Sequence, residues 1–515
     1  MKKILLLIIM QALLFSLSAQ NDIKWISFDN SKDKYDFKYF TRTDIQSPKA
    51  VFTIPHNKPF QQTKHSIFIR NYNSNLSEFN ETGIPPESPV TVSIGSFHDY
   101  IVFYGSMDDN ANPMSQYAKA NRILITDNDM NPLVTKEYPL HGKRHKFTGS
   151  PDIFYSCDST FLIVVNSEIQ NSDKPSFKEA PVIHYIDIFD KNLSLVWSDS
   201  VDFNMVFGVT PNNDNLVVDY VNGKLVVIAS CNAEKIKKIK PQLFIALFDR
   251  PQSYKIITKK DFIYEGFSYG TLITKEGKVY VSGLNMVTTV GTFIPQNKQL
   301  FFLSKDIINT NTEGLFKTYE IDKDFETEYA DYKPWLKESI RGPFDLFLIN
   351  GKIFYCSEHR YYVTSTSSSG STSSTTYYFK HITLMCFDTD GQIEWLRMLN
   401  KNVASKAAYA EFFCQAYPYE NGLCIFYYDY ADNISSAKFA DKPRVAIDDK
   451  LWVAKAVISP EGEINRSMIT NIGAYKVRAN LPKMERISGK QFLFVGRGSV
   501  LPKYNEQYYG FYNMD

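Results

Sequence analysis

LMCFDTDGQIEW (384–395) consists of an apolar run, a short polar turn and the start of a second run. The pattern recurs roughly every 55 to 80 residues, which is typical of a radial array of β-sheets. Its other occurrences are IFIRNYNSNLSEF (67–79), ILITDNDMNPLVTKEY (123–138), YIDIFDKNLSLVW (185–197), FIALFDRPQSYKII (244–257), LFFLSKDIINTNTEGLF (300–316), VAKAVISPEGEI (453–464) and YYGFYNMD (508–515). The repeat predicts an all-β chain.

A second recurring turn precedes another set of apolar runs. These runs are NGKLVVIAS (222–230), EGKVYVSG (276–283), NGKIFYCS (350–357), NGLCIFYY (421–428) and SGKQFLFVG (488–496). Asn-Gly is a strong hairpin signal because a type I′ turn needs positive φ at both central residues. Each unit is therefore strand A, tight turn, strand B, long loop, strand C, short turn and strand D, which is the order of a β-propeller blade.

The units predict a single β-propeller of eight four-stranded blades. The last unit lacks a strand D, whereas DIKWISFD (22–29) is an apolar-rich strand with no hairpin partner. We expect residues 22–29 to close the ring, because pairing them with the last blade covers an open sheet edge. The alternative is seven blades with residues 30–85 as an addition, since SPKAVFTI (47–54) lacks a glycine turn.

Two of the C–D hairpins carry a family resemblance. FDTDGQIEW (387–395) and IFDKNLSLVW (188–197) each have an acidic turn followed by a tryptophan in the outer strand. They resemble the hairpins of pyrroloquinoline-quinone-type eight-bladed propellers and of the outer-membrane assembly lipoproteins built on that scaffold. The resemblance implies the fold alone, because no quinone-binding residues and no lipoprotein cysteine can be matched.

The N-terminus has the features of a secretory signal peptide. Lys2 and Lys3 precede an apolar run from Ile4 to Leu17, and small residues follow. We expect residues 1–20 to be a leader and residues 21–515 to form one propeller domain in the periplasm or outside the cell. No later stretch approaches the roughly twenty apolar residues of a spanning helix, so no membrane span is predicted. The net charge of +1 gives no reason to expect nucleic acid as a partner.

Loop lengths distinguish the two faces of the predicted ring. The A–B and most C–D turns are short, whereas the B–C and D–A connections are long. Binding residues usually lie on long loops of a rigid scaffold, so this face is the candidate functional face. Its candidate ligand-binding residues are Lys143, Arg144, His145, Lys235, Lys237, Lys238, Phe267, Tyr269 and Trp335. The basic residues would attract an anionic partner. Alternatively, they are simply solvated and the aromatic residues plug the channel. Lys476, Arg478 and Lys483 form a further basic cluster on a D–A connection.

One B–C loop contains a Ser/Thr tract, TSTSSSGSTSSTT (364–376). Tyr361-Tyr362-Val363 and Tyr377-Tyr378-Phe379 flank it, and we expect them to extend strands B and C into a protruding finger. The finger is either a partner-capturing element or a tolerated insertion.

Signatures of catalysis and of metal binding are weak. Asp219, Glu265 and Asp345 lie near the predicted channel, where a glycosidase would need paired carboxylates. Asp108-Asp109 and Asp448-Asp449 lack the dense spacing of a calcium loop. We predict no catalytic residue, no metal and no cofactor.

The six cysteines permit disulfides in an exported protein. Cys356 and Cys386 are the one pair the strand order favours, and buried free thiols are the alternative. A two-residue turn at Asn421-Gly422 would place Tyr419 opposite Cys424, which argues against a bridge between Cys414 and Cys424.

These patterns favour a non-enzymatic exported scaffold that binds a protein or glycan partner through its long-loop face. A carbohydrate-active enzyme that uses channel carboxylates is one alternative. A structural subunit of an envelope secretion or assembly complex is the other.

Overall fold

The computed structural model describes only part of the chain. The described residues are 23–27, 36–42, 48–54, 66–72, 79–83, 93–108, 118–127, 129, 131–139, 151–169, 182–209, 211, 216–231, 240–264, 266–288, 295–325, 331, 344–366, 373–405, 413–435, 444–445, 450–486, 490–498 and 507–514. The predicted leader lies outside them. Among the described residues, no helix has the length and apolar character needed to cross a membrane.

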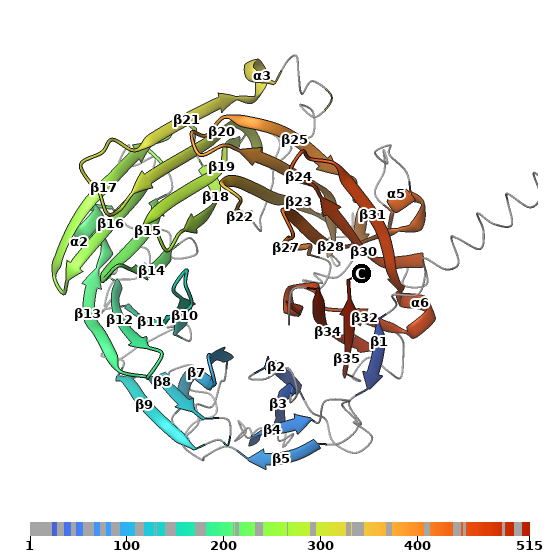
Figure 1. Ribbon diagram of the computed structural model, residues 1–515, viewed down its shortest axis with the longest axis horizontal. Coiled ribbons are helices and arrows are strands. Elements are labelled where there is room, and N and C mark those ends of the chain that lie inside the picture. Colours follow the sequence, from blue (N-terminus) through green and yellow to red (C-terminus); the bar gives the residue numbers. More distant parts are fainter. Residues whose placement is uncertain are drawn as a thin grey trace, which may run out of the picture.

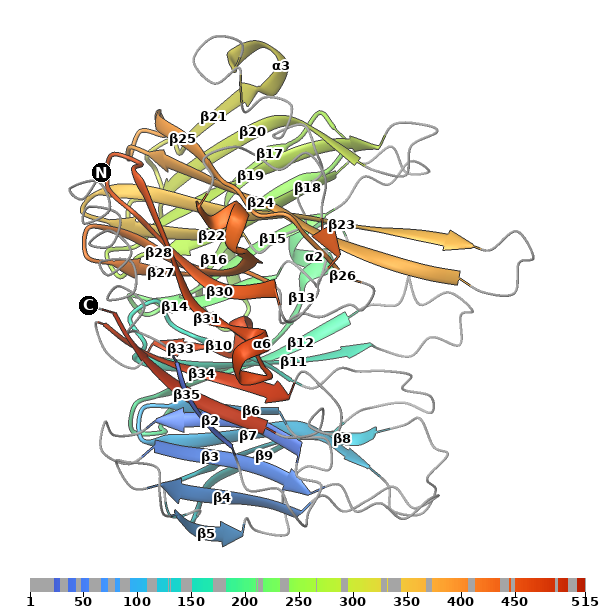
Figure 2. The same cartoon turned by 90° about the vertical axis from the view of Figure 1, so that its right-hand side faces the viewer.

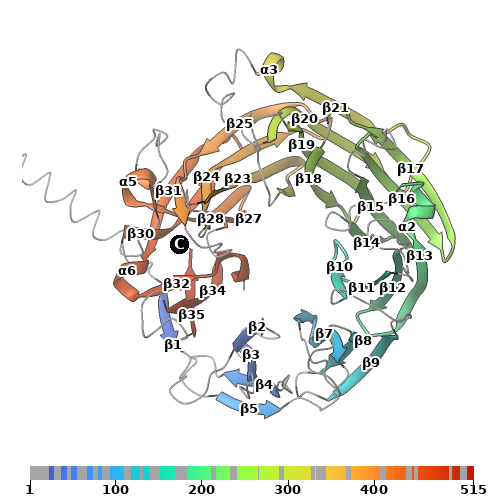
Figure 3. The same ribbon diagram turned by 180° about the vertical axis from the view of Figure 1, so that it is seen from behind.

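The described strands form eight sheets that follow one another around a ring (Figure 1; seen from behind in Figure 3). The first sheet contains β2 (Asp36–Arg42), β3 (Pro48–Ile54), β4 (Ser66–Tyr72) and β5 (Phe79–Gly83), and the second contains β6 (Ser93–Phe97), β7 (Tyr100–Asp108), β8 (Ala118–Thr126) and β9 (Pro132–Pro139). The third contains β10 (Asp152–Tyr155), β11 (Phe161–Ile169), β12 (Val182–Asp190) and β13 (Leu195–Asp202). The fourth contains β14 (Val217–Val221), β15 (Lys224–Cys231), β16 (Gln242–Arg250) and β17 (Ser253–Asp261). All pairs within them are antiparallel, so the predicted β-propeller fold is confirmed.

The next three sheets repeat this plan. They are β18 (Gly266–Ile273), β19 (Lys278–Thr288), β20 (Pro295–Asp306) and β21 (Leu315–Glu320); β22 (Phe344–Ile349), β23 (Lys352–Thr366), β24 (Ser373–Phe387) and β25 (Ile393–Leu399); and β27 (Gln415–Tyr419), β28 (Gly422–Tyr430), β30 (Leu451–Ile458) and β31 (Ile464–Asn471). Two short strands, β26 (Val403–Ser405) and β29 (Arg444–Val445), extend the second of these sheets. The described helices are α2 (Phe203–Phe207), α3 (Ile321–Asp324), α5 (Ala431–Ser435), α6 (Ile472–Tyr475) and the 3-10 helix η4 (Leu481–Lys483).

The last sheet joins the two ends of the chain. It contains β32 (Val477–Ala479), β33 (Glu485–Arg486), β34 (Gln491–Gly498), β35 (Gln507–Asn513) and the N-terminal β1 (Lys24–Ser27). β1 pairs antiparallel with β35, with Trp25 opposite Gly510, as predicted for residues 22–29 (Figure 1). Ile23 is fully buried in the core beside it. The seven-bladed alternative leaves residues 30–85 as an addition, but β2, β3, β4 and β5 within them form a four-stranded sheet.

Two of the three Asn-Gly turns have the positive φ that the sequence predicts at both central residues. Asn222 and Gly223 both have positive φ, as do Asn350 and Gly351. In the third Asn-Gly site, Tyr419 pairs with Gly422, so the turn lies one residue earlier than predicted. Glycine is required there because a Cβ on Gly422 would lie 1.9 Å from the Ile458 carbonyl oxygen.

This shift also corrects the predicted register around Cys424. Tyr417, rather than Tyr419, lies opposite Cys424. The turn consists of Glu420, which has a φ of 50°, and Asn421.

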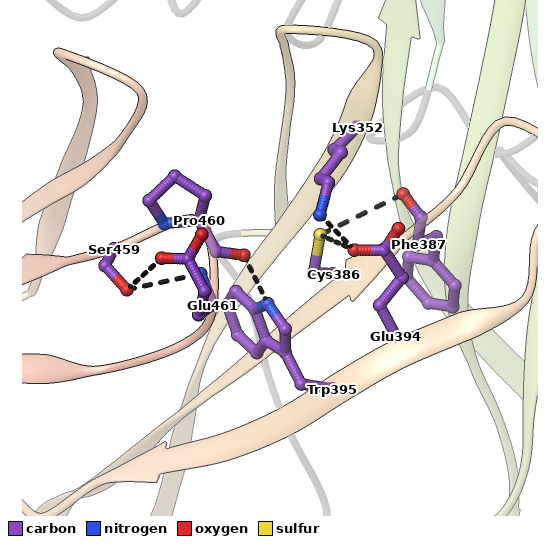
Figure 4. A network of polar contacts seen from close by, with 8 residues as sticks. All are labelled: Lys352, Cys386, Phe387, Glu394, Trp395, Ser459, Pro460 and Glu461. Carbon is purple, nitrogen blue, oxygen red and sulfur yellow. Dashed lines mark hydrogen bonds and ion pairs between the residues drawn. The ribbon is translucent and has the colours of Figure 1, made fainter.

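The acidic C–D turns and the outer tryptophans have structural roles. Asp388 Oδ1 accepts a hydrogen bond from the Gln392 backbone N–H at 2.7 Å, which closes its turn. Trp395 Nε1 donates to the Pro460 carbonyl at 2.8 Å, in the corresponding turn of the next sheet (Figure 4). The motif FDTDGQIEW therefore stabilises a turn and connects neighbouring sheets.

Candidate functional site

The predicted finger is the most prominent feature of the long-loop side. β23 and β24 are each 15 residues long and pair out to Thr366 and Ser373. They project beyond the other strands of the ring (Figure 2). The predicted extension of these strands is confirmed.

Two cross-strand pairs of tyrosines lie between the root and the Ser/Thr tip of the finger. The rings of Tyr361 and Tyr378 stack with their centroids 4.6 Å apart, and those of Tyr362 and Tyr377 lie 6.0 Å apart. The Tyr362 side chain is 53% exposed. Nearer the tip, the hydroxyls of Thr364 and Thr375 are 3.0 Å apart. A rigid aromatic surface of this kind loses little side-chain entropy when it binds a partner.

Two short strands brace the root of the finger. Tyr377 to Phe379 of β24 pair antiparallel with β26, and β26 pairs in parallel with β29. β29 belongs to the connection between β28 and β30 of the next sheet. The finger is therefore held by backbone hydrogen bonds to β26, which is itself paired with β29, and not by its own hairpin alone.

A buried ion pair lies at the same root. The Lys401 Nζ donates to Glu358, and both side chains are fully buried. The second carboxylate oxygen of Glu358 accepts from the Cys414 backbone N–H at 3.3 Å. The Arg360 guanidinium lies 3.9 Å from the ring centroid of Phe413. Partners from two parts of the chain thus fix the strand at the point where it leaves the ring.

Buried polar side chains recur where the second and third strands of a sheet approach the long-loop side. We call this set the polar layer: Asn166, Glu168, His184, Ser230, Gln242, Asn285, Asn297, Gln299, Glu358, His381 and Asp429. Several of its members form hydrogen bonds with nearby side chains. Asn121 Nδ2 donates to Asn166 Oδ1 at 2.6 Å, and Gln299 Nε2 donates to Glu320 at 2.7 Å.

Burial controls the charge of several groups in the polar layer. It lowers the pKa of His184 to about 4 and raises that of Asp429 to about 6. Burial therefore favours the neutral form of both groups.

Most of the predicted ligand-binding residues cannot be placed. Lys143, Arg144, His145, Lys235, Lys237, Lys238 and Trp335 lie outside the described residues, and for Phe267 only the backbone in β18 is described. Tyr269 packs against the apolar cluster between the β14–β17 and β18–β21 sheets. Burial raises the pKa of its hydroxyl, which is hydrogen-bonded to Ser230. Tyr269 therefore has a structural role in the packing between these two sheets.

The predicted basic cluster at residues 476–483 is wrong in part. Arg478 lies in β32 and is only 5% exposed. Lys476 is the C-cap residue of α6, with a φ of 56°. Arg478 therefore cannot belong to an exposed basic surface.

The channel carboxylates are not neighbours. Asp219 lies in β14 and Asp345 in β22, and the β18–β21 sheet separates their sheets in chain order. Burial raises the pKa of each to about 6. Asp219 accepts from the backbone N–H of Tyr220 at 2.7 Å and of Cys157 at 3.2 Å. Glu265 lies outside the described residues, and within the described part no cluster of three or more His, Cys, Asp or Glu side chains is suited to a metal.

Sequence reasoning missed the ion pair and the bracing strands. Glu358 and Lys401 are separated by 43 residues, and neither forms part of a recognisable motif. The three-residue β26 carries no strand pattern of its own. The only available signal was the position of Glu358 at the end of an apolar run just before the tyrosines.

Comparisons with known proteins give a likeness of fold. No protein-family model matches the chain, and no curated protein matches it. The WD40 domain of SCAP from fission yeast is similar at 9% identity over 95% of this chain and 98% of that one, with a TM-score of 0.40. The propeller domain of the Trilobed protease from Pyrococcus furiosus is similar at 11% identity over 85% and 96%, with a TM-score of 0.33.

A further similar structure is a larger protein. The acylaminoacyl peptidase of Pyrococcus horikoshii matches at 10% identity, with a TM-score of 0.34, over 89% of this chain and 57% of its own. The present chain thus spans little more than half of that peptidase. At these levels of similarity, the comparisons carry no argument about activity.

Proposed function

We propose that the protein is an exported, non-enzymatic propeller scaffold of the cell envelope, whose finger captures a protein partner. The observation that carries the proposal is the extension of β23 and β24 beyond the ring, with the exposed Tyr362 on a braced root. Export rests on the predicted leader, residues 1–20.

The chemistry of the finger suits a protein–protein contact. Tyrosines are enriched among the residues that dominate binding energy, because they combine large apolar area with a polar hydroxyl. Tyr362 and Val363 are 53% and 44% exposed, so they present apolar surface without rearrangement. A rigid root lowers the entropic cost of docking.

A protein fits the finger better than a glycan does. Small ligands are usually bound in concave sites that bury most of their surface. The finger is convex and projects from the ring, so it is suited to enter a recess in a larger partner (Figure 2). The basic loops predicted on the same face would favour an acidic partner surface.

Site-specific photocrosslinking tests the proposal. A photoreactive phenylalanine analogue replaces Tyr362 in the full chain, expressed in its native cells. The matched control carries the analogue at Tyr254, which is 46% exposed on the outer strand β17. We expect a discrete protein adduct at Tyr362 with at least a several-fold higher yield than at Tyr254.

Two further outcomes are informative. Equal yields at both positions would refute a partner-binding finger. Binding of the purified protein to a glycan array, lost in Tyr362→Ala and retained in Tyr254→Ala, would replace the protein partner by a glycan.

A further inference from the structure

We propose that Cys356 and Cys414 become joined by a disulfide bond in the mature protein, which links the root of the finger to the next sheet. The inference does not depend on the partner proposed above, because it concerns a covalent link within the chain.

The fold brings the two residues together at the interface between two sheets. Cys356 lies in β23, and Cys414 directly precedes β27, the first strand of the next sheet. Both side chains are at most 2% exposed and belong to one apolar cluster. The Cys414 backbone N–H donates to Glu358, two residues beyond Cys356 and therefore on the same side of the strand.

The two thiols also interact electrostatically. The neighbouring Cys414 thiol, together with burial, raises the pKa of Cys356 well above its ordinary value. A disulfide would replace two buried polar S–H groups by an apolar bond, which suits the surrounding cluster. It would also close a loop of several dozen residues, and long loops give the largest stabilisation in the chain-entropy model.

The other described cysteines have different neighbours. Cys386 Sγ donates to Glu394 Oε2 at 3.7 Å (Figure 4). Cys356 lies opposite Leu384 and Cys386 lies opposite Phe354, so the pair favoured by the sequence is not directly cross-strand. Cys424 Sγ lies 3.6 Å from Met514 Sδ.

Formation of the bond requires a disulfide oxidant, either a protein of the exporting compartment or oxidised glutathione. One thiolate attacks the oxidant's disulfide and forms a mixed disulfide, and the second thiolate displaces the oxidant's remaining sulfur. The protein loses two protons and two electrons, and the oxidant is reduced to two thiols. Because the thiols are buried in the folded interface, we expect oxidation during folding rather than afterwards.

Mass spectrometry of the full chain without its leader tests the proposal. Reduced, unfolded protein is refolded with oxidised and reduced glutathione, unfolded again in acid, and alkylated without reductant. We expect four alkylated cysteines, a mass lower by two hydrogen atoms, and one peptide link between Cys356 and Cys414. Reduction of this species should lower its Tm by roughly 2–6 °C.

Serine variants define the pair. Cys386→Ser should retain the link, whereas Cys414→Ser should lose it. If Cys414→Ser does not fold, the peptide map of the unsubstituted chain still decides the question. Six alkylated cysteines, or a link that includes Cys386, would overturn the proposal.

Discussion

Glu358 of β23 and Lys401, which follows β25, form an ion pair in which neither side chain is exposed to solvent. The pair joins the root of the finger to the segment that leads into β26, and β26 in turn pairs with β24. Removing two charges from water is costly, and a buried pair of this kind is retained only where geometry and further hydrogen bonds compensate. The Cys414 N–H supplies one of these additional bonds.

Lys401→Met should be strongly destabilising, because it leaves the Glu358 carboxylate buried without its cation. We expect a loss of about 3–5 kcal/mol in the free energy of unfolding, measured by urea denaturation. The matched control is Lys352→Met, since Lys352 and Glu394 form a solvent-accessible pair at 2.6 Å (Figure 4). This control variant should lose only about 0–1 kcal/mol in the free energy of unfolding. Equal losses in the two variants would contradict the assigned role of burial.

Asp345→Asn should change the pH dependence of stability. Burial raises the pKa of Asp345 to about 6, so the folded state retains a proton that the unfolded state has already lost between about pH 4 and 6. Stability therefore falls as pH rises through this window, and the neutral amide removes this contribution. Between pH 4 and pH 8, the free energy of unfolding of the variant should rise by up to about 3 kcal/mol relative to that of the unsubstituted protein. Urea denaturation at both pH values measures this gain, and a difference that is constant with pH would disprove it.

Gly462→Ala should be more destabilising than Gly223→Ala. Both glycines have positive φ, 82° and 76° respectively, so both variants have backbone strain of about 1–2 kcal/mol. A Cβ on Gly462 would also lie 2.7 Å from Trp395 Cδ2, whereas nothing lies within 4 Å of one on Gly223. We expect an additional loss of about 1–3 kcal/mol, together with a change in tryptophan fluorescence as Trp395 is displaced. Equal losses of stability in the two variants, without a change in tryptophan fluorescence, would contradict the close contact between Gly462 and Trp395.

The sequence was informative where a single local rule decides the outcome. Asn222-Gly223 specifies its turn because both residues must adopt positive φ, and the turn lies where the pattern predicts it. The finger was predictable because the tyrosines on both sides of the Ser/Thr tract continue the apolar strands. The unpaired strand in residues 22–29 could be assigned because an open sheet edge is unfavourable.

Contacts between distant segments could not be predicted in the same way. Gly422 lies just after the turn and not within it. A glycine is needed at this position because a Cβ would collide with the Ile458 carbonyl oxygen of β30. Cys356 approaches Cys414 rather than Cys386, because contact between neighbouring sheets decides the pairing and no local pattern encodes it. The same limit applies to Glu358 and Lys401.

Removal of residues 21–29 should open the ring and expose the edge of β35. β1 contributes the outer strand of the last sheet, Ile23 is fully buried, and Trp25 packs against the core cluster. The truncated chain would therefore lose backbone pairing and apolar burial at the same site, and its free edge would favour aggregation. We expect a lower Tm and concentration-dependent association in light scattering. A synthetic peptide of residues 22–29 should reverse both effects by adding a strand, whereas a peptide with Ile23→Asp and Trp25→Asp should not. A truncated chain with unchanged Tm would show that the ring does not depend on this strand.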